Sequence, residues 1–237
     1  MSDAETTAEQ YDAMAAEYSA ANDDESVYNS RYERPAMLRL LGDIAGQRVL
    51  DAGCGAGQLT AELIDRGASV AGIDVSENMI SIARERVGDQ AAFFVGSFDG
   101  RLPFEDASFD VVVASLALHY LRDWAPPLAE FRRVLRPGGR IVFSTHHPTM
   151  DWKQISPDDY FAKKQITETW TKRGKPFDVT FWRRSLSEMS REIDAAGLVI
   201  ARIDEPMPDD SLAAIDAKND AYLRTHPHFL FLTLRAA

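Results

Sequence analysis

A glycine-rich segment that follows a short apolar run has the clearest chemical potential in this sequence. Gly53, Gly55 and Gly57 occupy alternate positions after Asp51, and Gln58 then opens a helical pattern. Glycine tolerates positive φ and has no side chain, so the backbone of such a turn can lie directly against a ligand. The N–H groups that open the next helix point into the same space. The segment is therefore predicted to be a ligand-binding loop at the carboxyl end of a strand.

A second acidic residue, Asp74, ends the next apolar run about twenty residues further on, where a carboxylate can accept hydrogen bonds from ribose hydroxyls. A loop and an acid at this spacing fit two cofactor classes, nicotinamide dinucleotides and S-adenosylmethionine. The dinucleotide pattern Gly-x-Gly-x-x-Gly fails because Gln58 occupies its sixth position. Asp51 would repel a pyrophosphate but would suit the positively charged amine of a methionine group. S-adenosylmethionine is therefore favoured, and a nicotinamide oxidoreductase is disfavoured.

The elements that must position these residues alternate between strand and helix. Strands are predicted at 48–51, 69–74, 92–95, 109–115 and 140–144, with helices at 58–66, 76–87 and 128–135. Two later strands, 198–203 and 229–234, raise the number to seven. This order predicts an α/β fold with a doubly wound, mostly parallel seven-stranded sheet whose last strand is antiparallel.

A single domain with four parts is expected from the 237 residues. These parts are an N-terminal helical cap (1–46), a cofactor-binding core (47–145), a lid insertion (146–184), and a closing helix with strands (185–237). In the cap, helices are predicted at 7–20 and 28–41, with a polar loop at 21–26. Residues 136–139, Arg-Pro-Gly-Gly, are predicted to be a stop and turn. The lid is predicted to contain a hairpin, and residues 205–210 a loop.

Several motifs in this order resemble the class I S-adenosylmethionine-dependent methyltransferases, most closely the small-molecule, methyltransferase type 11-like branch. The motifs are 49–60, Asp74, 102–104, 108–110 and 134–139. The resemblance implies a Rossmann-like fold and S-adenosyl-L-methionine as the cofactor. It also implies a set of cofactor-binding residues: Tyr18, Asp51, Gly53, Cys54, Gly55, Gly57, Asp74, Val75, Met79, Ser97, Phe98, Ser115 and Leu116.

The expected reaction is in-line displacement of a methyl group onto an oxygen, nitrogen or carbon atom of a small-molecule acceptor. Positioning of the reactants supplies much of the rate enhancement in such a reaction. A hydroxyl or carbon acid also needs a base, and His119 and His147 are the candidate catalytic residues because they follow the fourth and fifth strands. Two alternatives stay open: a non-catalytic S-adenosylmethionine-binding module and an RNA methyltransferase.

The composition limits the partners of the protein. A net charge of −11 disfavours binding to nucleic acid or to an anionic membrane surface. The single cysteine, Cys54, excludes an intramolecular disulfide, and no metal site is expected. The N-terminal sequence lacks the features of a signal peptide, so a cytoplasmic location is expected. For the oligomeric state, a monomer or a homodimer is expected.

Overall fold

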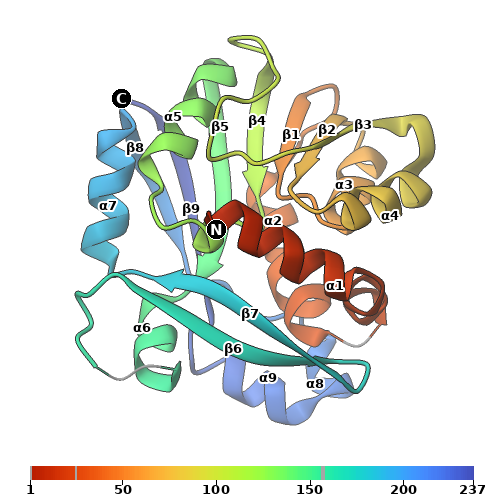
Figure 1. Cartoon of the computed structure of the whole chain (residues 1–237), viewed down its shortest axis with the longest axis vertical. Helices are drawn as coiled ribbons and strands as arrows, with labels where there is room; N and C mark the ends of the chain where they lie inside the picture. The colour runs from red at the N-terminus through yellow and green to blue at the C-terminus, as the bar shows by residue number, and fades with distance from the viewer. Residues whose placement is uncertain (1, 25, 156–157) are drawn as a thin grey trace.

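A seven-stranded sheet forms the centre of the computed structural model, which describes residues 2–24, 26–155 and 158–237 (Figure 1). The strand order is β3-β2-β1-β4-β5-β9-β8. The strands of this sheet are β1 (Arg48–Ala52), β2 (Ser69–Asp74), β3 (Ala91–Val95), β4 (Phe109–Ala114), β5 (Leu135–His146), β8 (Leu198–Asp204) and β9 (Phe229–Ala236). The strands from β3 to β5 in this order pair in parallel, and β9 is antiparallel to both β5 and β8. The predicted mostly parallel α/β sheet is confirmed.

Helices cover both faces of the sheet, and none in the described part of the chain is long and apolar enough to cross a membrane. The α-helices of the described chain are α1 (Asp3–Asp24), α2 (Arg34–Leu41), α3 (Gln58–Asp65), α4 (Glu77–Val87), α5 (Ala125–Val134), α6 (Pro148–Met150), α7 (Leu186–Ala195), α8 (Leu212–Ile215) and α9 (Ala217–Leu223). Short turns of other helix types are η1 (Asn29–Glu33), η2 (Gly88–Gln90), η3 (Leu118–Tyr120) and η4 (Asp151–Ile155). Helices α2, α3 and α4 pack on one face of the sheet, and α5 and α7 on the other.

The central strands are buried on both faces, which explains their apolar sequences. Val111, Val112 and Val113 of β4 are all fully buried. Parallel pairing places Asp51 of β1 opposite Val113 and Gly72, and Asp74 of β2 opposite Val95. Because the carboxyl ends of parallel strands share one edge, this register brings the two acids to the same side of the molecule.

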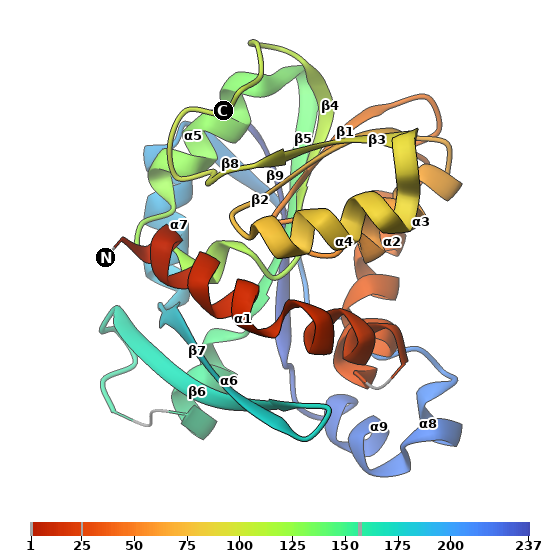
Figure 2. The same ribbon diagram turned by 45° about the vertical axis from the view of Figure 1, so that its right-hand side comes forward.

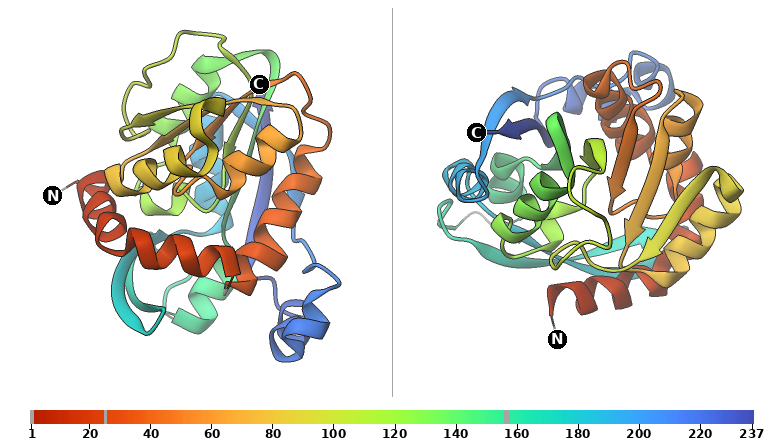
Figure 3. Two further views of the ribbon diagram at one scale, coloured as in Figure 1. Left: turned by 90° about the vertical axis from the view of Figure 1, so that its right-hand side faces the viewer. Right: turned by 90° about the horizontal axis from the view of Figure 1, so that it is seen from above.

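Helix α1 and a separate hairpin, β6 (Lys164–Lys172) with β7 (Lys175–Arg183), lie beyond this carboxyl edge. Figure 2 and the left view of Figure 3 show α1 running between the sheet and the hairpin. The side chain of Gln10 bonds both the hydroxyl and the N–H group of Thr180 in the hairpin, at 3.1 Å each. Toward the sheet, the Asp12 carboxylate accepts hydrogen bonds from the Ser76 hydroxyl and the Asn78 N–H. The helix is thus anchored on both sides.

Two local predictions were wrong, and two short helices were missed. Residues 136–139 do not form a turn that separates a helix from a strand; they form a bulge within β5. Phe109 of β4 pairs with Leu135, and Val111 pairs with Arg140, so the four residues between them have no partners in the same register. Helix α1 extends to Asp24, into the expected polar loop at 21–26, because its buried face reaches Ala21, which is 3% exposed. Helices α8 and α9 between β8 and β9 were not predicted, because they are too short for a clear hydrophobic periodicity.

Candidate functional site

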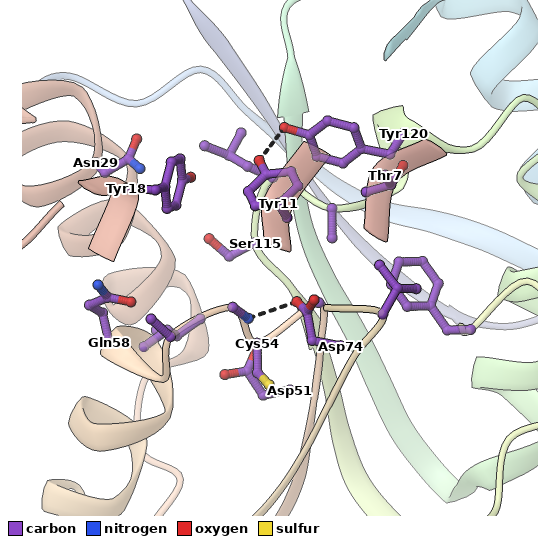
Figure 4. A pocket seen from close by; sticks show the side chains of 18 of the residues that line it. Thr7, Tyr11, Tyr18, Asn29, Asp51, Cys54, Gln58, Asp74, Ser115 and Tyr120 are labelled. Atoms are coloured by element: carbon purple, nitrogen blue, oxygen red, sulfur yellow. Dashed lines mark hydrogen bonds between the residues drawn. The ribbon is translucent and has the colours of Figure 1, made fainter. Parts of the chain in front are cut away.

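A cleft at the carboxyl ends of β1, β2 and β4 brings most of the predicted cofactor residues together (Figure 4). The predicted residues that line it are Tyr18, Asp51, Gly53, Cys54, Gly55, Asp74, Val75, Ser97, Phe98, Ser115 and Leu116. Gly57 and Met79 lie behind this lining. A Cβ atom on Gly57 would be 3.1 Å from the Cβ of Ala83, so this glycine allows α4 to approach the loop. Met79 is fully buried beneath α1.

The glycines of the loop serve different purposes. Gly53 and Gly55 have φ angles of +79° and +52°, in a region that other residues rarely adopt. A Cβ atom on Gly53 would lie 2.5 Å from the Cβ of Ala117, whereas one on Gly55 would meet no atom within 4 Å. Gly53 is therefore required for packing, while Gly55 presents its backbone to the open space of the cleft.

Asp51 is a buried carboxylate with one oxygen left unpartnered. Its side chain accepts a hydrogen bond from the Thr60 hydroxyl at 2.6 Å through Oδ2. Its Oδ1 has no hydrogen-bond partner among the described residues, and the residue is 1% exposed. The pKa of Asp51 is raised to about 7, mainly by burial. The hydrogen bond from Thr60 lowers this pKa, and the nearby charges of Asp74 and Glu33 raise it. A buried oxygen without a donor is costly, and the amine of S-adenosylmethionine would supply that donor.

Asp74 is held in one orientation by backbone amides. Its Oδ2 accepts from the Gly55 N–H at 2.8 Å, and its Oδ1 accepts from the Ser76 N–H at 3.0 Å. Burial raises the pKa of Asp74, and these two amide hydrogen bonds oppose that rise. A carboxylate oxygen has two lone pairs, so each Asp74 oxygen can accept one more hydrogen bond, as a ribose diol would require.

Glu33 also lines the cleft and was missed by the sequence analysis. It ends the π-helical turn η1, is 2% exposed, and accepts hydrogen bonds through Oε1 from the hydroxyls of Ser115 and Ser144. Burial raises its pKa. A glutamate within an expected helix carries no signal that it faces a binding site, since only the tertiary fold brings η1 to the ends of β4 and β5.

Three tyrosines close the cleft on the side of α1. Tyr11 packs edge-on against both Tyr18 and Tyr120, and the Tyr11 and Tyr120 hydroxyls are 2.5 Å apart (Figure 4). Burial raises the pKa of Tyr11 and of Tyr120 well above the ordinary value, so both hydroxyls keep their protons. This contact joins the N-terminal helix to η3, the turn after β4.

A second cavity of about 550 Å³ adjoins the first on the hairpin side. Tyr18, Asn29, Leu116 and Tyr120 line both cavities and so mark their junction. Leu116 has a φ of +49°, which is uncommon for a residue with a side chain. The remaining lining residues are Ser26, Tyr28, His119, His146, Met150, Glu168, Thr169, Trp170, Thr171, Lys172, His228 and Phe229. Strand β6 of the hairpin therefore supplies much of one wall.

The two predicted catalytic histidines lie in different surroundings. His119 lines the second cavity, is 1% exposed, and has no hydrogen-bond partner at either ring nitrogen in the described structure. Burial lowers its pKa well below the ordinary value, and His146 and Arg184 contribute. His147 is not among the residues that line either cavity, because its ring turns away: Nε2 lies 2.8 Å from Glu205 and Nδ1 accepts the Thr149 N–H.

Comparison with known proteins agrees with this geometry. A family model described as a methyltransferase domain matches residues 50–143. The chain is 40% identical over 139 residues to a demethylmenaquinone methyltransferase from Clavibacter sepedonicus, covering 57% of each protein. It is 32% identical over 191 residues to the protein of the same name from Lactococcus lactis, covering 78% of this chain and 72% of that protein.

A solved structure shows the same fold across nearly its whole length. The S-adenosylmethionine-dependent methyltransferase from Mesorhizobium loti aligns with a TM-score of 0.70 and 26% identity, covering 90% of this chain and 99% of that one. The chain belongs to the class I S-adenosylmethionine-dependent methyltransferase family, and S-adenosyl-L-methionine is its cofactor. Among the relatives matched by sequence, the alignment to the Clavibacter protein spans little more than half of that protein's length.

Proposed function

We propose that this chain transfers the methyl group of S-adenosylmethionine to a small-molecule acceptor bound in the second cavity. The observation that carries the proposal is the junction of the two cavities at Tyr18, Asn29, Leu116 and Tyr120. At such a junction a group held in one cavity can meet a group held in the other. The activity of the named relatives, which are demethylmenaquinone methyltransferases, supports a small-molecule acceptor.

In this proposal the first cleft holds the cofactor through residues of three strand ends. Asp51 binds the amine through its unpartnered Oδ1, Asp74 binds the ribose hydroxyls, and Val75 and Phe98 flank the adenine. When bound, S-adenosylmethionine supplies a methyl group on a positively charged sulfur, which a nucleophile displaces in line. The chain's own contribution is positioning and exclusion of water, and positioning can supply about 7–11 kcal/mol of the barrier. Tyr11 and Tyr120 provide the exclusion.

The second cavity suits a small molecule in size and in lining. Its volume lies within the usual range for ligand pockets, about 300–1,000 Å³. Trp170, Tyr28 and Phe229 offer flat apolar contacts, while Glu168 and Lys172 offer polar ones. An RNA acceptor is disfavoured because a net charge of −11 opposes binding of a phosphate backbone.

Calorimetry and product analysis test the proposal together. Isothermal titration should show binding of S-adenosylmethionine, and binding should weaken at least tenfold in Asp74→Ala. Mass spectrometry should then show S-adenosylhomocysteine and a methylated product when the enzyme is given a panel of hydroxylated aromatics and amines. Cofactor binding without turnover of any acceptor in the panel would favour the non-catalytic binding module.

A further inference from the structure

The histidine that precedes His147 in the sequence lines the second cavity and lies beside a buried acid. We propose that His146, oriented by Asp151, is the general base of the reaction, and that the acceptor presents an aromatic hydroxyl group to it. The proposal rests on the proposed function. His146 ends β5 and lines the cavity, and its Nδ1 lies 3.3 Å from Oδ1 of Asp151, which is 3% exposed.

The pairing has the arrangement that a histidine base requires. Neither His146 Nδ1 nor Asp151 Oδ1 has a hydrogen-bond partner elsewhere in the described structure. A carboxylate beside Nδ1 favours the tautomer with its proton on that atom, which leaves the lone pair of Nε2 for the cavity. At 3.3 Å the two groups are not aligned as a hydrogen bond, and such contacts commonly tighten when substrate binds.

The groups around His146 distinguish it from its neighbours. The His119 ring stacks on it at 4.2 Å with 20° between the planes, and His228 lies on the β9 side. Burial lowers the pKa of His228 to about 3 and that of His119 well below its ordinary value, so both rings remain neutral. Asp151, whose Oδ1 lies 3.3 Å from Nδ1 of His146, is the acid placed to stabilise a positive charge on that ring. Among the described residues, no carboxylate is hydrogen-bonded to His119.

The same rings indicate the class of acceptor. His119 and Phe229 both lie nearly parallel to the His146 ring, at 20° and 23°, and Phe181 meets it edge-on. These contacts surround His146 with aromatic rings, which favours an aromatic acceptor. A neutral amine needs no base, whereas a phenol with a pKa near 10 is mostly protonated at neutral pH. A base among aromatic rings therefore points to an aromatic hydroxyl.

The chemical step follows from this assignment. Nε2 of His146 takes the hydroxyl proton while the acceptor oxygen forms a bond to the methyl carbon. The carbon–sulfur bond breaks, and its electron pair stays on sulfur. The products are an aryl methyl ether, S-adenosylhomocysteine and a histidinium that releases its proton to solvent. Asp151 is a positioning residue, because it touches the base and not the acceptor.

Nitrogen-15 NMR of histidine-labelled protein tests the pairing without any acceptor. The chain has five histidines, and His146→Gln assigns the relevant signals. We expect His146 to carry its proton on Nδ1, and we expect Asp151→Asn to change this tautomer while leaving His226, an exposed histidine, unchanged. A proton on Nε2 in the native protein, or an unchanged tautomer in Asp151→Asn, would overturn the assignment.

Kinetics test the role of the base, with phenol, catechol, 1-naphthol and 4-nitrophenol as acceptors and aniline and benzylamine as comparisons. His146→Gln should lower kcat toward the weakly acidic phenols by at least about 100-fold and leave the S-adenosylmethionine Kd within about twofold. The loss should be smaller with 4-nitrophenol, which is largely ionised at pH 8 without help. His226→Gln is the matched control and should retain native activity.

The outcomes separate this inference from the proposed function. If the native protein methylates the amines and none of the phenols, or if His146→Gln retains its kcat toward phenols, the inference fails while methyl transfer stands. If the native protein does not bind S-adenosylmethionine, the proposed function itself fails. The NMR experiment decides the His146–Asp151 pairing when the panel yields no product.

Discussion

Replacement of Asp51 by asparagine should affect cofactor binding and folding stability in opposite directions. The substitution keeps the shape of the side chain and an oxygen that can accept the Thr60 hydroxyl, but it removes the negative charge. Asp51 lines the cleft and its Oδ1 has no hydrogen-bond partner among the described residues, so the proposal assigns this charge to the cofactor amine. The asparagine variant should therefore bind S-adenosylmethionine more weakly.

The expected loss follows from the value of a charged hydrogen bond, about 1.5–3 kcal/mol. This corresponds to a Kd increase of roughly 10- to 150-fold. The loss should depend on pH, because Asp51 has a pKa of about 7 in the folded protein. Below pH 7 the native carboxyl is protonated and cannot attract the amine, so native affinity should fall by up to about tenfold per pH unit.

The free energy of unfolding should change with pH in the direction opposite to cofactor affinity. Below pH 3.8, the ordinary value, Asp51 is protonated in both the folded and unfolded states and has no effect. As pH rises toward 7, the unfolded chain ionises while the buried carboxyl resists, so the native protein loses stability, by up to about 4 kcal/mol above pH 7. Asp51→Asn removes this penalty and should raise the free energy of unfolding at pH 8, with little change at pH 4.

Calorimetric titration from pH 5.5 to 8.5 and urea unfolding of both proteins measure these effects. The affinity of the native protein for S-adenosylmethionine should rise with pH and then level off above about pH 7. Residue 51 should make no contribution to the pH dependence of that affinity in the asparagine variant. A native Kd that does not vary with pH, or an asparagine variant that binds as tightly as the native protein at pH 8, would refute the reasoning.

Three further predictions concern the same cleft. Gly53→Ala should lower the free energy of unfolding by about 2 kcal/mol or more, because its Cβ would meet Ala117. Gly55→Ala should fold but bind the cofactor weakly, and thermal melts and cofactor titration of both variants test this difference. Asp74→Ala should lower the melting temperature as well as affinity, because the Gly55 N–H loses its acceptor. Tyr11→Phe should cost about 1 kcal/mol in urea unfolding; an unchanged midpoint would show that its hydroxyl contact is immaterial.

Much of the fold could be predicted because its signals are local. The run at Val111–Val113 has the composition of a strand buried on both faces, and it lies at the centre of the sheet. The errors arose where tertiary packing overrides local pattern. Residues 136–139 have turn composition, yet pairing of β5 with β4 resumes beyond them and absorbs them as a bulge. The extension of α1 depends on burial of Ala21 against the rest of the protein.

The residues of the functional site could likewise be predicted only in part from the sequence. Asp51 and Asp74 could be found from sequence because each follows directly from its position at a strand end. Glu33 could not, because η1 reaches the cleft only through the packing of the N-terminal cap. Nor could sequence decide between His146, the last residue of β5, and His147, which follows the strand and caps α6, since only the folded structure shows that His146 lines the cavity.

The most direct test of the whole account is a crystal structure of the complex with S-adenosylhomocysteine. We expect the amine nitrogen within hydrogen-bond distance of Asp51 Oδ1, the ribose hydroxyls on Asp74, and the sulfur at the junction marked by Leu116 and Tyr120. A product molecule bound with its sulfur directed away from the second cavity, or with its amine remote from Asp51, would contradict the account.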